Sequence, residues 1–367
     1  MLAHLEGLVK SGFVTNHMSL CCVPVQTGLR SLLHVLLIRD IRLFLRYSQQ
    51  PLEWFILVVM NPYEYSSNNT RFDIQLRRRT PAWVWNTVEF PAAFQFPRKK
   101  SDVARGDYFH PSASGKAPFV ILLHGVGDAS MIPCRWLARS LARRGIASFV
   151  PQLVVHSSRL RGAGWRGVPH MSDEEWYQTY RTAVVEVRQL VDWAGCRNEL
   201  DETKVGVLGV SFGSLISAIA MAVDERITAA TLIVSGGNSG KIVQKARAGV
   251  VRKGYQVTEA EYQAGQQDYL QYLAEVAEKG FEDVVPSRVS YLNDPMTYAR
   301  YLRERPLLMI NARWDEFIPS EATLDFWEAC NRPSIRWLPT THSGIWLWYP
   351  YIKKSVGNFF ESAFGTG

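Results

Sequence analysis

The sequence predicts an α/β protein with a mostly parallel central sheet flanked by helices and interrupted by a helical insertion. Short apolar runs typical of strands alternate with helix-like patterns from about residue 82 to 237, and the alternation resumes over residues 306–367. Residues 119–123 are apolar at every position, as is typical of a strand buried on both faces of a parallel sheet. Residues 238–305 interrupt this alternation with polar, helix-like patterns, and they predict a helical cap over an active site.

The predicted elements follow one another along the chain. Strands are expected at residues 83–90, 105–109, 119–123, 147–155, 204–210, 227–234, 307–311 and 334–338. Helices are expected at residues 133–144, 172–193, 213–223, 258–278, 320–330 and 351–364. Ser172 and the three acidic residues after it are typical of a helix start, because the hydroxyl caps a free N–H group and the acids face the positive end of the helix dipole.

Residues 1–81 are expected to form an N-terminal helical arm. Between residues 29 and 45, leucine and isoleucine recur at helix-like spacing, and charged residues interrupt the pattern. Such an arm can pack on the main domain, contact a membrane surface peripherally, or contact a second copy of the chain. A turn-rich stretch over residues 61–69 ends it.

The composition excludes several classes of protein. The 367 residues carry a formal net charge of +7, but Lys and Arg are scattered, so the charge does not predict a nucleic-acid partner. The basic clusters at residues 77–79 and 98–100 are interpreted as solvent-exposed loop residues. The arginines of residues 156–170 could steer an anionic substrate, but solvent exposure is the favoured interpretation. Five cysteines without a CxxC motif predict neither a disulfide framework nor a zinc site, which favours the cytoplasm. No segment has the roughly 18 apolar residues of a membrane span.

The strongest motif is G-x-S-x-G at residues 209–213, centred on Ser211. A strand-like run precedes it and a helix-like run of small residues follows it. The serine of such a motif lies on a sharp strand-to-helix turn, where a side chain two residues before or after it would collide with the turn. The motif therefore predicts an exposed, nucleophilic hydroxyl at the carboxyl end of the sheet.

A second motif, HGVGD at residues 124–128, follows the buried strand directly. Acyl transfer needs two N–H donors to stabilise an oxyanion, one from the residue after the nucleophile and one from the loop after an earlier strand. Phe212 and Val126 are the residues expected to supply them. A phosphate-binding loop is disfavoured, because no G-K-[ST] sequence follows.

The base and the acid are expected in loops after later strands. A serine needs an adjacent base, and His342 alone among the eight histidines follows the motif. Asp315, in the loop after residues 307–311, is the expected partner of the imidazole, because a carboxylate there can fix its tautomer. Glu316 is the main alternative, and Asp294 and Asp325 are weaker ones.

Together, HGVGD, GVSFG, residues 312–319 and residues 341–343 make the chain resemble the α/β-hydrolase superfamily. It looks nearest to bacterial esterases of the dienelactone-hydrolase and acyl-peptidase-like branch. The resemblance implies an α/β-hydrolase fold, a small-molecule acyl ester as substrate and a serine carboxylesterase that works through an acyl-enzyme. It implies neither a metal nor an organic cofactor. His124, Trp314 and Trp346 are candidates to line the substrate pocket, although aromatic residues can equally belong to the core.

Three alternatives to the esterase remain open from the sequence. A peptidase acting on short peptides and an acyltransferase would use the same fold and the same three side chains. A ligand-binding protein without catalysis would also keep the fold, but it is expected to lack one member of the catalytic set, and none is missing here.

Overall fold

The computed structural model describes residues 61–66, 71–94, 103–113, 115–128, 130–156, 158–159, 171–255 and 257–366. All of them belong to the larger of two compact units of the chain, residues 58–367. The expected arm lies outside the described residues except for its last part, and so does the basic cluster at residues 98–100.

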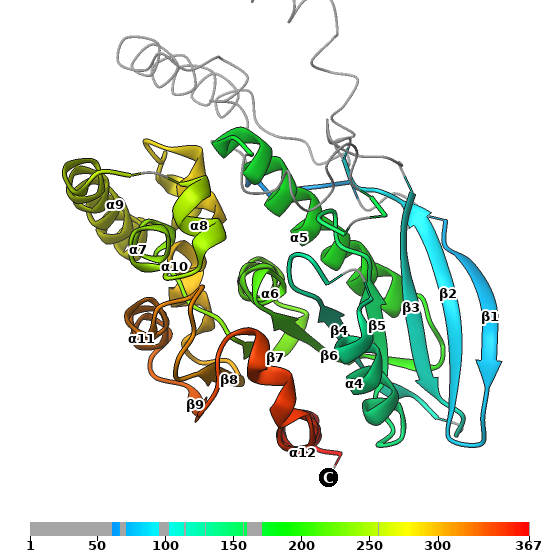
Figure 1. The fold of residues 1–367 in the computed structure, drawn as a ribbon. Coiled ribbons are helices and arrows are strands. Elements are labelled where there is room, and N and C mark those ends of the chain that lie inside the picture. The colour runs from blue at the N-terminus through cyan, green and yellow to red at the C-terminus, as the bar shows by residue number, and fades with distance from the viewer. Residues whose placement is uncertain are drawn as a thin grey trace, which may run out of the picture. The chain divides into compact units, whose positions relative to one another are not determined.

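A nine-stranded sheet forms the centre of this unit (Figure 1). Its strands are β1 (Asp73–Arg79), β2 (Trp83–Pro91), β3 (Val103–Pro111), β4 (Ala117–Leu123), β5 (Ala147–Pro151), β6 (Leu200–Val210), β7 (Ile227–Ile233), β8 (Leu307–Ala312) and β9 (Ser334–Leu338). Their order in the sheet is β1-β2-β3-β5-β4-β6-β7-β8-β9. The pairs β1–β2, β2–β3 and β3–β5 are antiparallel, and the others are parallel. The predicted mostly parallel sheet is confirmed.

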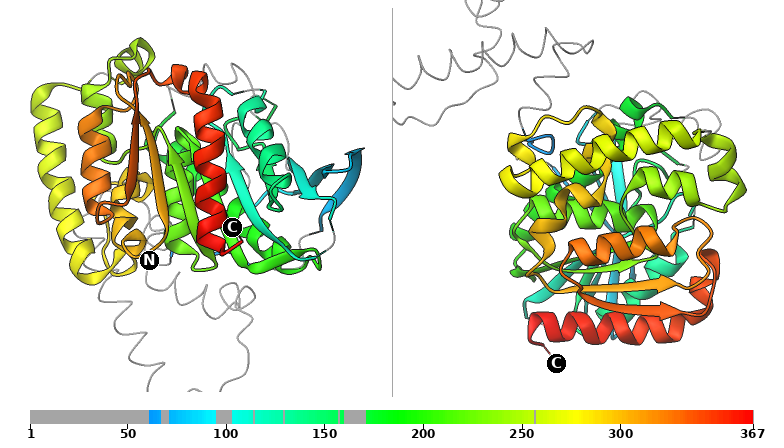
Figure 2. Two further views of the ribbon diagram at one scale, coloured as in Figure 1. Left: turned by 90° about the horizontal axis from the view of Figure 1, so that it is seen from below. Right: turned by 90° about the vertical axis from the view of Figure 1, so that its left-hand side faces the viewer.

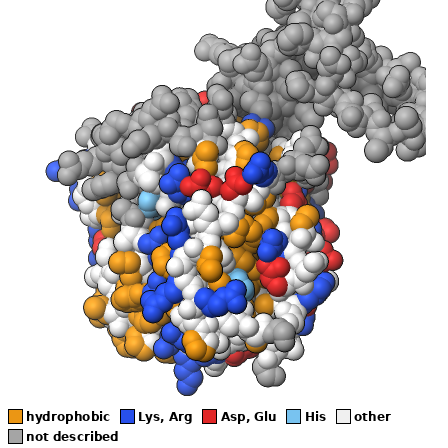
Figure 3. Space-filling view, turned by 90° about the vertical axis from the view of Figure 1, so that its right-hand side faces the viewer, with side chains coloured by type: hydrophobic (Ala, Val, Ile, Leu, Met, Phe, Trp, Pro, Cys, Tyr) orange, Lys and Arg blue, Asp and Glu red, His pale blue; other side chains and the backbone are white. Residues whose placement is uncertain are grey.

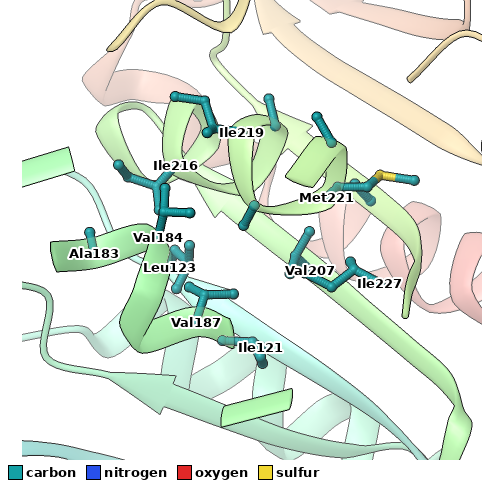
Figure 4. Packing of buried hydrophobic residues seen from close by; sticks show 14 of the residues in the cluster. Ile121, Leu123, Ala183, Val184, Val187, Val207, Ile216, Ile219, Met221 and Ile227 are labelled. Carbon is teal, nitrogen blue, oxygen red and sulfur yellow. The ribbon is translucent and has the colours of Figure 1, made fainter. Parts of the chain in front are cut away.

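Helices cover both faces of the sheet. α4 (Ile132–Ala142) and α12 (Tyr349–Phe364) lie on one face, and α5 (Asp173–Gly195), α6 (Phe212–Val223) and α11 (Ser320–Ala329) lie on the other. Figure 4 shows the packing on the α5 and α6 face. There, Leu123 and Val207 of the sheet pack with Ile216 and Ile219 of α6 and with Val184 of α5. Apolar area is therefore removed from water on both faces, as the fully buried strand β4 requires.

The chain between β7 and β8 is helical, as predicted. It contains α7 (Ser239–Lys245), α8 (Gly249–Gly254), α9 (Glu259–Lys279), α10 (Pro295–Tyr298) and three short 3₁₀ turns (Figure 2). Thr258 and Glu261 form a capping box that satisfies free N–H groups at the start of α9. The N–H groups of Arg247 and Ala248 bond to the carbonyl oxygen of Glu316, each at 2.8 Å, and so tie this region to the loop after β8.

Two expected boundaries are wrong. β1 lies within the range assigned to the helical arm, because its side chains are all exposed and leave no buried face to show a strand periodicity. The basic side chains of residues 77–79 are exposed as expected, but they belong to this strand and not to a loop. Figure 3, seen from the β1 side of Figure 1, shows Lys and Arg interspersed with acidic and apolar side chains. β5 ends at Pro151 instead of residue 155, since the Leu153 N–H bonds to a histidine ring and not to a neighbouring strand.

Candidate active site

Ser211 lies on the turn between β6 and α6 with backbone angles of φ 54° and ψ −122°. A positive φ is rare for a residue with a side chain, and here the flanking glycines make it possible. A Cβ atom on Gly209 would approach the carbonyl oxygen of Gly213 to 2.1 Å, and one on Gly213 would approach that of Leu123 to 2.3 Å. The predicted collision with the turn is confirmed for Gly209, whereas a side chain on Gly213 would overlap backbone atoms at the end of β4.

The structure brings the hydroxyl of Ser211, the imidazole of His342 and the carboxylate of Asp315 together. The Nε2 atom of His342 lies 3.0 Å from Ser211 Oγ. Its Nδ1 atom lies 2.8 Å and 2.9 Å from the two oxygens of Asp315. Because a carboxylate only accepts hydrogen bonds, Nδ1 carries the proton and leaves Nε2 free to accept the Ser211 O–H. This is the hydrogen-bond arrangement that a serine nucleophile and its base require.

Backbone groups fix the orientation of Asp315. Its side chain is buried, and one oxygen accepts hydrogen bonds from the N–H groups of Phe317 at 2.9 Å and Ile318 at 2.8 Å. The ring of Phe317 lies 4.9 Å from that of His342, centroid to centroid. The carboxylate and the imidazole are therefore both held by groups from the loop after β8.

The three alternative carboxylates occupy other places. Glu316 accepts the backbone N–H of His342 at 2.9 Å, so it contacts the histidine through its main chain and not through its ring. Asp294 is buried and accepts N–H groups of Asn238, Ser239 and Met296. Asp325 pairs with Lys241. The contact of Glu316 was missed in the sequence, where no pattern links a carboxylate to a main-chain group 26 residues away.

Phe212 and Val126 both lie close to Ser211 in the chain or in space. Phe212 is the first residue of α6, so its N–H has no acceptor within the helix. Val126 follows Gly125, where a Cβ atom would lie 3.3 Å from Ser211 Cβ. The Val126 side chain is exposed, and its loop closes with a hydrogen bond from the Asp128 N–H to the Gly125 oxygen. The residue after the serine and the loop after β4 thus both lie beside Ser211.

His124 does not line a pocket, contrary to the prediction. It is 1% exposed, and each ring nitrogen bonds to the backbone. Nδ1 lies 2.8 Å from the Gly125 oxygen, and Nε2 accepts the Leu153 N–H at 3.1 Å. Burial lowers the pKa of His124 to about 4, so the ring is neutral at neutral pH. Its hydrogen bonds connect the loop after β4 to the end of β5.

The two tryptophans predicted in the pocket have different environments. Trp314 is 57% exposed, and Trp346 is partly buried against the core on the α4 and α12 side. Another aromatic cluster lies beside Ser211, where the Phe212 ring contacts Trp176 and Tyr180 of α5. The Trp176 indole donates to the hydroxyl of Tyr255 at 2.8 Å, and so connects this cluster to the end of α8.

No group of three or more His, Cys, Asp and Glu side chains in the described part is arranged to hold a metal ion. No helix within the described ranges combines the length and the apolar character needed to cross a bilayer.

Comparison with known proteins identifies the fold. A family model described as the alpha/beta hydrolase fold matches residues 118–283. The chain has the α/β-hydrolase fold, and the resemblance to this superfamily that its motifs indicate is confirmed. No curated protein matches the sequence.

Solved structures give the same result at low sequence identity. An acetyl xylan esterase from Paenibacillus sp. R4 superimposes with a TM-score of 0.58 and 17% identity, over 81% of this chain and 90% of that one. Acetyl xylan esterase 1 from Thermoanaerobacterium sp. JW/SL YS485 gives a TM-score of 0.56 and 15% identity, over 84% and 92%. An α/β hydrolase from Penicillium sp. sh18 superimposes with a TM-score of 0.50 and 17% identity, over 76% of this chain and 98% of that one. At these identities the similarity defines the fold.

Proposed function

We propose that the protein is a serine carboxylesterase, which cleaves a small-molecule ester through an acyl-enzyme on Ser211. The observation that carries the proposal is the single imidazole of His342, which contacts the Ser211 hydroxyl with one nitrogen and the Asp315 carboxylate with the other. Neither contact needs a change of rotamer. A ligand-binding protein without catalysis has no use for this hydrogen-bond chain or for the strained backbone at Ser211.

The first half of the reaction forms the acyl-enzyme. Ser211 Oγ attacks the carbonyl carbon of the ester while its proton passes to His342 Nε2. The resulting imidazolium is stabilised by Asp315, which stays ionised. Collapse of the tetrahedral intermediate breaks the bond to the alcohol oxygen, and that oxygen takes the proton from Nε2 as the alcohol leaves.

The second half returns the enzyme to its starting state. A water molecule gives a proton to His342 Nε2 and attacks the acyl carbon. The bond to Ser211 Oγ then breaks, the proton returns to that oxygen, and the carboxylic acid leaves. In both halves the N–H groups of Phe212 and Val126 would stabilise the oxyanion, and losing one such donor costs about 10²–10³ in turnover.

A comparison of two serine variants tests the proposal. Ser211→Ala should abolish hydrolysis of p-nitrophenyl acetate, because loss of a triad serine costs roughly 10⁶ in turnover. Ser362→Ala, at an exposed position of α12, should hydrolyse it like the wild type. Acetyl esters are the first choice because two proteins of similar fold are named acetyl xylan esterases. Undiminished hydrolysis by the Ser211 variant would exclude the proposed mechanism.

The product distinguishes hydrolysis from transfer. If water is the acceptor, adding a competing alcohol or amine should leave the free carboxylic acid as the main product. A dominant new ester or amide would instead identify an acyltransferase. Cleavage of short peptide amides at rates comparable to esters would identify a peptidase.

A further inference from the structure

Six exposed apolar side chains lie in segments that follow the carboxyl ends of strands β4, β8 and β9. We call this set the rim, and its members are Val126, Ile132, Trp136, Trp314, Leu347 and Tyr351. Leu347 is 84% exposed, Trp314 57% and Trp136 50%. Single exposed apolar residues are common on protein surfaces, but large ones gathered at one end of a fold indicate a contact surface.

Contacts between α4 and the start of α12 place four of the rim residues close together. Ile132 and Trp136 are four residues apart on α4 and share one side of that helix. The Trp136 ring contacts Tyr349 at 5.6 Å, centroid to centroid, at the start of α12, which lies beside α4 (Figure 1). Leu347 and Tyr351 lie two residues before and after Tyr349.

The remaining members of the rim border the candidate active site. The Trp314 N–H bonds to the Thr340 carbonyl at 3.0 Å, two residues before His342. Val126 follows Gly125, whose added Cβ atom would lie 3.3 Å from Ser211 Cβ. The exposed apolar residues and the reactive hydroxyl therefore lie at the same end of the sheet.

Positive charges accompany the rim. Arg313, Lys353 and Lys354 are exposed, and none of them forms an ion pair within the described residues, although Lys353 lies over the Tyr349 ring at 6.0 Å from its centroid. Lys354 is three residues from Tyr351 and shares its side of α12. The acidic side chains in the same loops, Asp128 and Glu316, are only partly exposed, and each accepts a backbone N–H. Among the described residues of these segments, the exposed charges without an ion pair are thus basic.

We propose that the rim docks the protein on an anionic lipid surface. Tryptophan and tyrosine favour the boundary between water and lipid, leucine and isoleucine enter the acyl region, and lysine and arginine attract anionic headgroups. Two other occupants of the rim fit its charge less well. A second copy of the chain would bring further positive charge to a basic surface, and so would the N-terminal arm, which contains Arg30, Arg39 and Arg42. The proposal concerns binding and does not rest on the proposed hydrolysis.

Vesicle co-sedimentation of the full chain tests the proposal. Every protein carries Ser211→Ala, so that no hydrolysis occurs during the measurement. Leu347→Asp removes the most exposed member of the rim, and Leu76→Asp, 59% exposed on the edge strand β1, is the matched control. The vesicles consist of phosphatidylcholine with or without phosphatidylglycerol.

The proposal predicts binding to the phosphatidylglycerol vesicles, weaker binding to pure phosphatidylcholine, and release by salt. Leu347→Asp should lower the partition coefficient between vesicles and water by about tenfold or more, because the variant lacks the leucine side chain that would enter the lipid. Leu76→Asp should bind as strongly as the protein that carries Ser211→Ala alone. Absence of vesicle binding would overturn the proposal. Equal vesicle binding of the Leu347 and Leu76 variants would also overturn it, because the binding would then belong to another segment. A dimer that Leu347→Asp dissociates would overturn it as well, because the rim would then contact a second copy of the chain.

A separate assay distinguishes this proposal from the proposed function. With Ser211 intact, Leu347→Asp should hydrolyse the water-soluble p-nitrophenyl acetate at the wild-type rate. Vesicle binding without any ester hydrolysis would reject the catalytic proposal and leave the docking surface standing.

Discussion

The carboxylate of Glu316 accepts the backbone N–H of His342 at 2.9 Å, while the neighbouring Asp315 holds the imidazole of the same histidine. Two consecutive acidic residues thus fix the main chain and the side chain of the proposed base. The carbonyl oxygen of Glu316 also accepts the N–H groups of Arg247 and Ala248, so the loop after β8 joins the helical region to the His342 loop.

Glu316→Ala should lower kcat/KM for p-nitrophenyl acetate by roughly tenfold or more. The substitution leaves a partly buried N–H without an acceptor, which costs about 1–3 kcal/mol and loosens the His342 loop. Glu316→Gln keeps an oxygen acceptor and should recover most of the activity. If Glu316 acted through its charge, Glu316→Gln would lower kcat/KM as much as Glu316→Ala, and the pH profile of kcat/KM would shift. That outcome would contradict a positioning role.

His124 should make the protein less stable in acid. Its pKa is about 4 in the folded state and near 6.5 when exposed, so the unfolded chain binds the proton first as the pH falls. Above about pH 6.5 the ring is neutral in both states, and His124 does not lower the free energy of unfolding. Between pH 6.5 and pH 4 this free energy falls progressively, by up to roughly 3 kcal/mol.

Urea unfolding at several pH values measures this effect. The free energy of unfolding should fall more steeply between pH 6.5 and pH 4 for the wild type than for His124→Asn, which cannot take up the proton. Parallel curves for the two proteins would show that the folded ring titrates normally and is not held neutral by burial.

Gly209→Ala should prevent the β6–α6 turn from forming. The new methyl group would lie 2.1 Å from a backbone oxygen of Gly213, an overlap that no side-chain rotation relieves. We expect a loss of several kcal/mol, or insoluble protein, in urea unfolding. Gly265→Ala is the control, since an added Cβ on this α9 residue meets nothing within 4 Å, and it should raise stability by about 0.5–1 kcal/mol. A fully stable Gly209 variant would refute the steric explanation of the motif.

Arg159 and Glu186 form a buried ion pair with two parallel contacts of 2.6 Å and 2.7 Å, and their side chains are 2% and 3% exposed. Arg159→Met should destabilise the protein by about 3–5 kcal/mol, because it leaves a buried carboxylate unpaired. The double variant with Glu186→Leu should be more stable than Arg159→Met alone. In contrast, Arg332→Met removes an exposed pair with Glu328 and should change stability by less than about 1 kcal/mol. Similar losses for both arginine variants would contradict the buried pair.

The alternation of strands and helices was predictable because burial imposes a periodicity on residues that are close in sequence. The approach of Ser211 to His342 was predictable too, since glycine spacing marks the turn and one histidine follows it. The neutral state of His124 was not, because it depends on burial that the sequence does not show. The buried pair of Arg159 and the contact of Glu316 were not either, because no sequence motif marks their partners, which lie 27 and 26 residues away. The expected solvent exposure of Arg159 is wrong for the same reason. The strand β1 was not predicted, because both of its faces are exposed.

Covalent labelling with a fluorophosphonate, followed by peptide mass spectrometry, tests the central claim most directly. The phosphonate reacts with a serine hydroxyl only when an adjacent base activates it. We predict one label on Ser211 in the wild type, and labelling slowed by about 10³ or more in His342→Ala. An unlabelled Ser211 in the folded wild type, or labelling that does not depend on His342, would contradict the proposed active site.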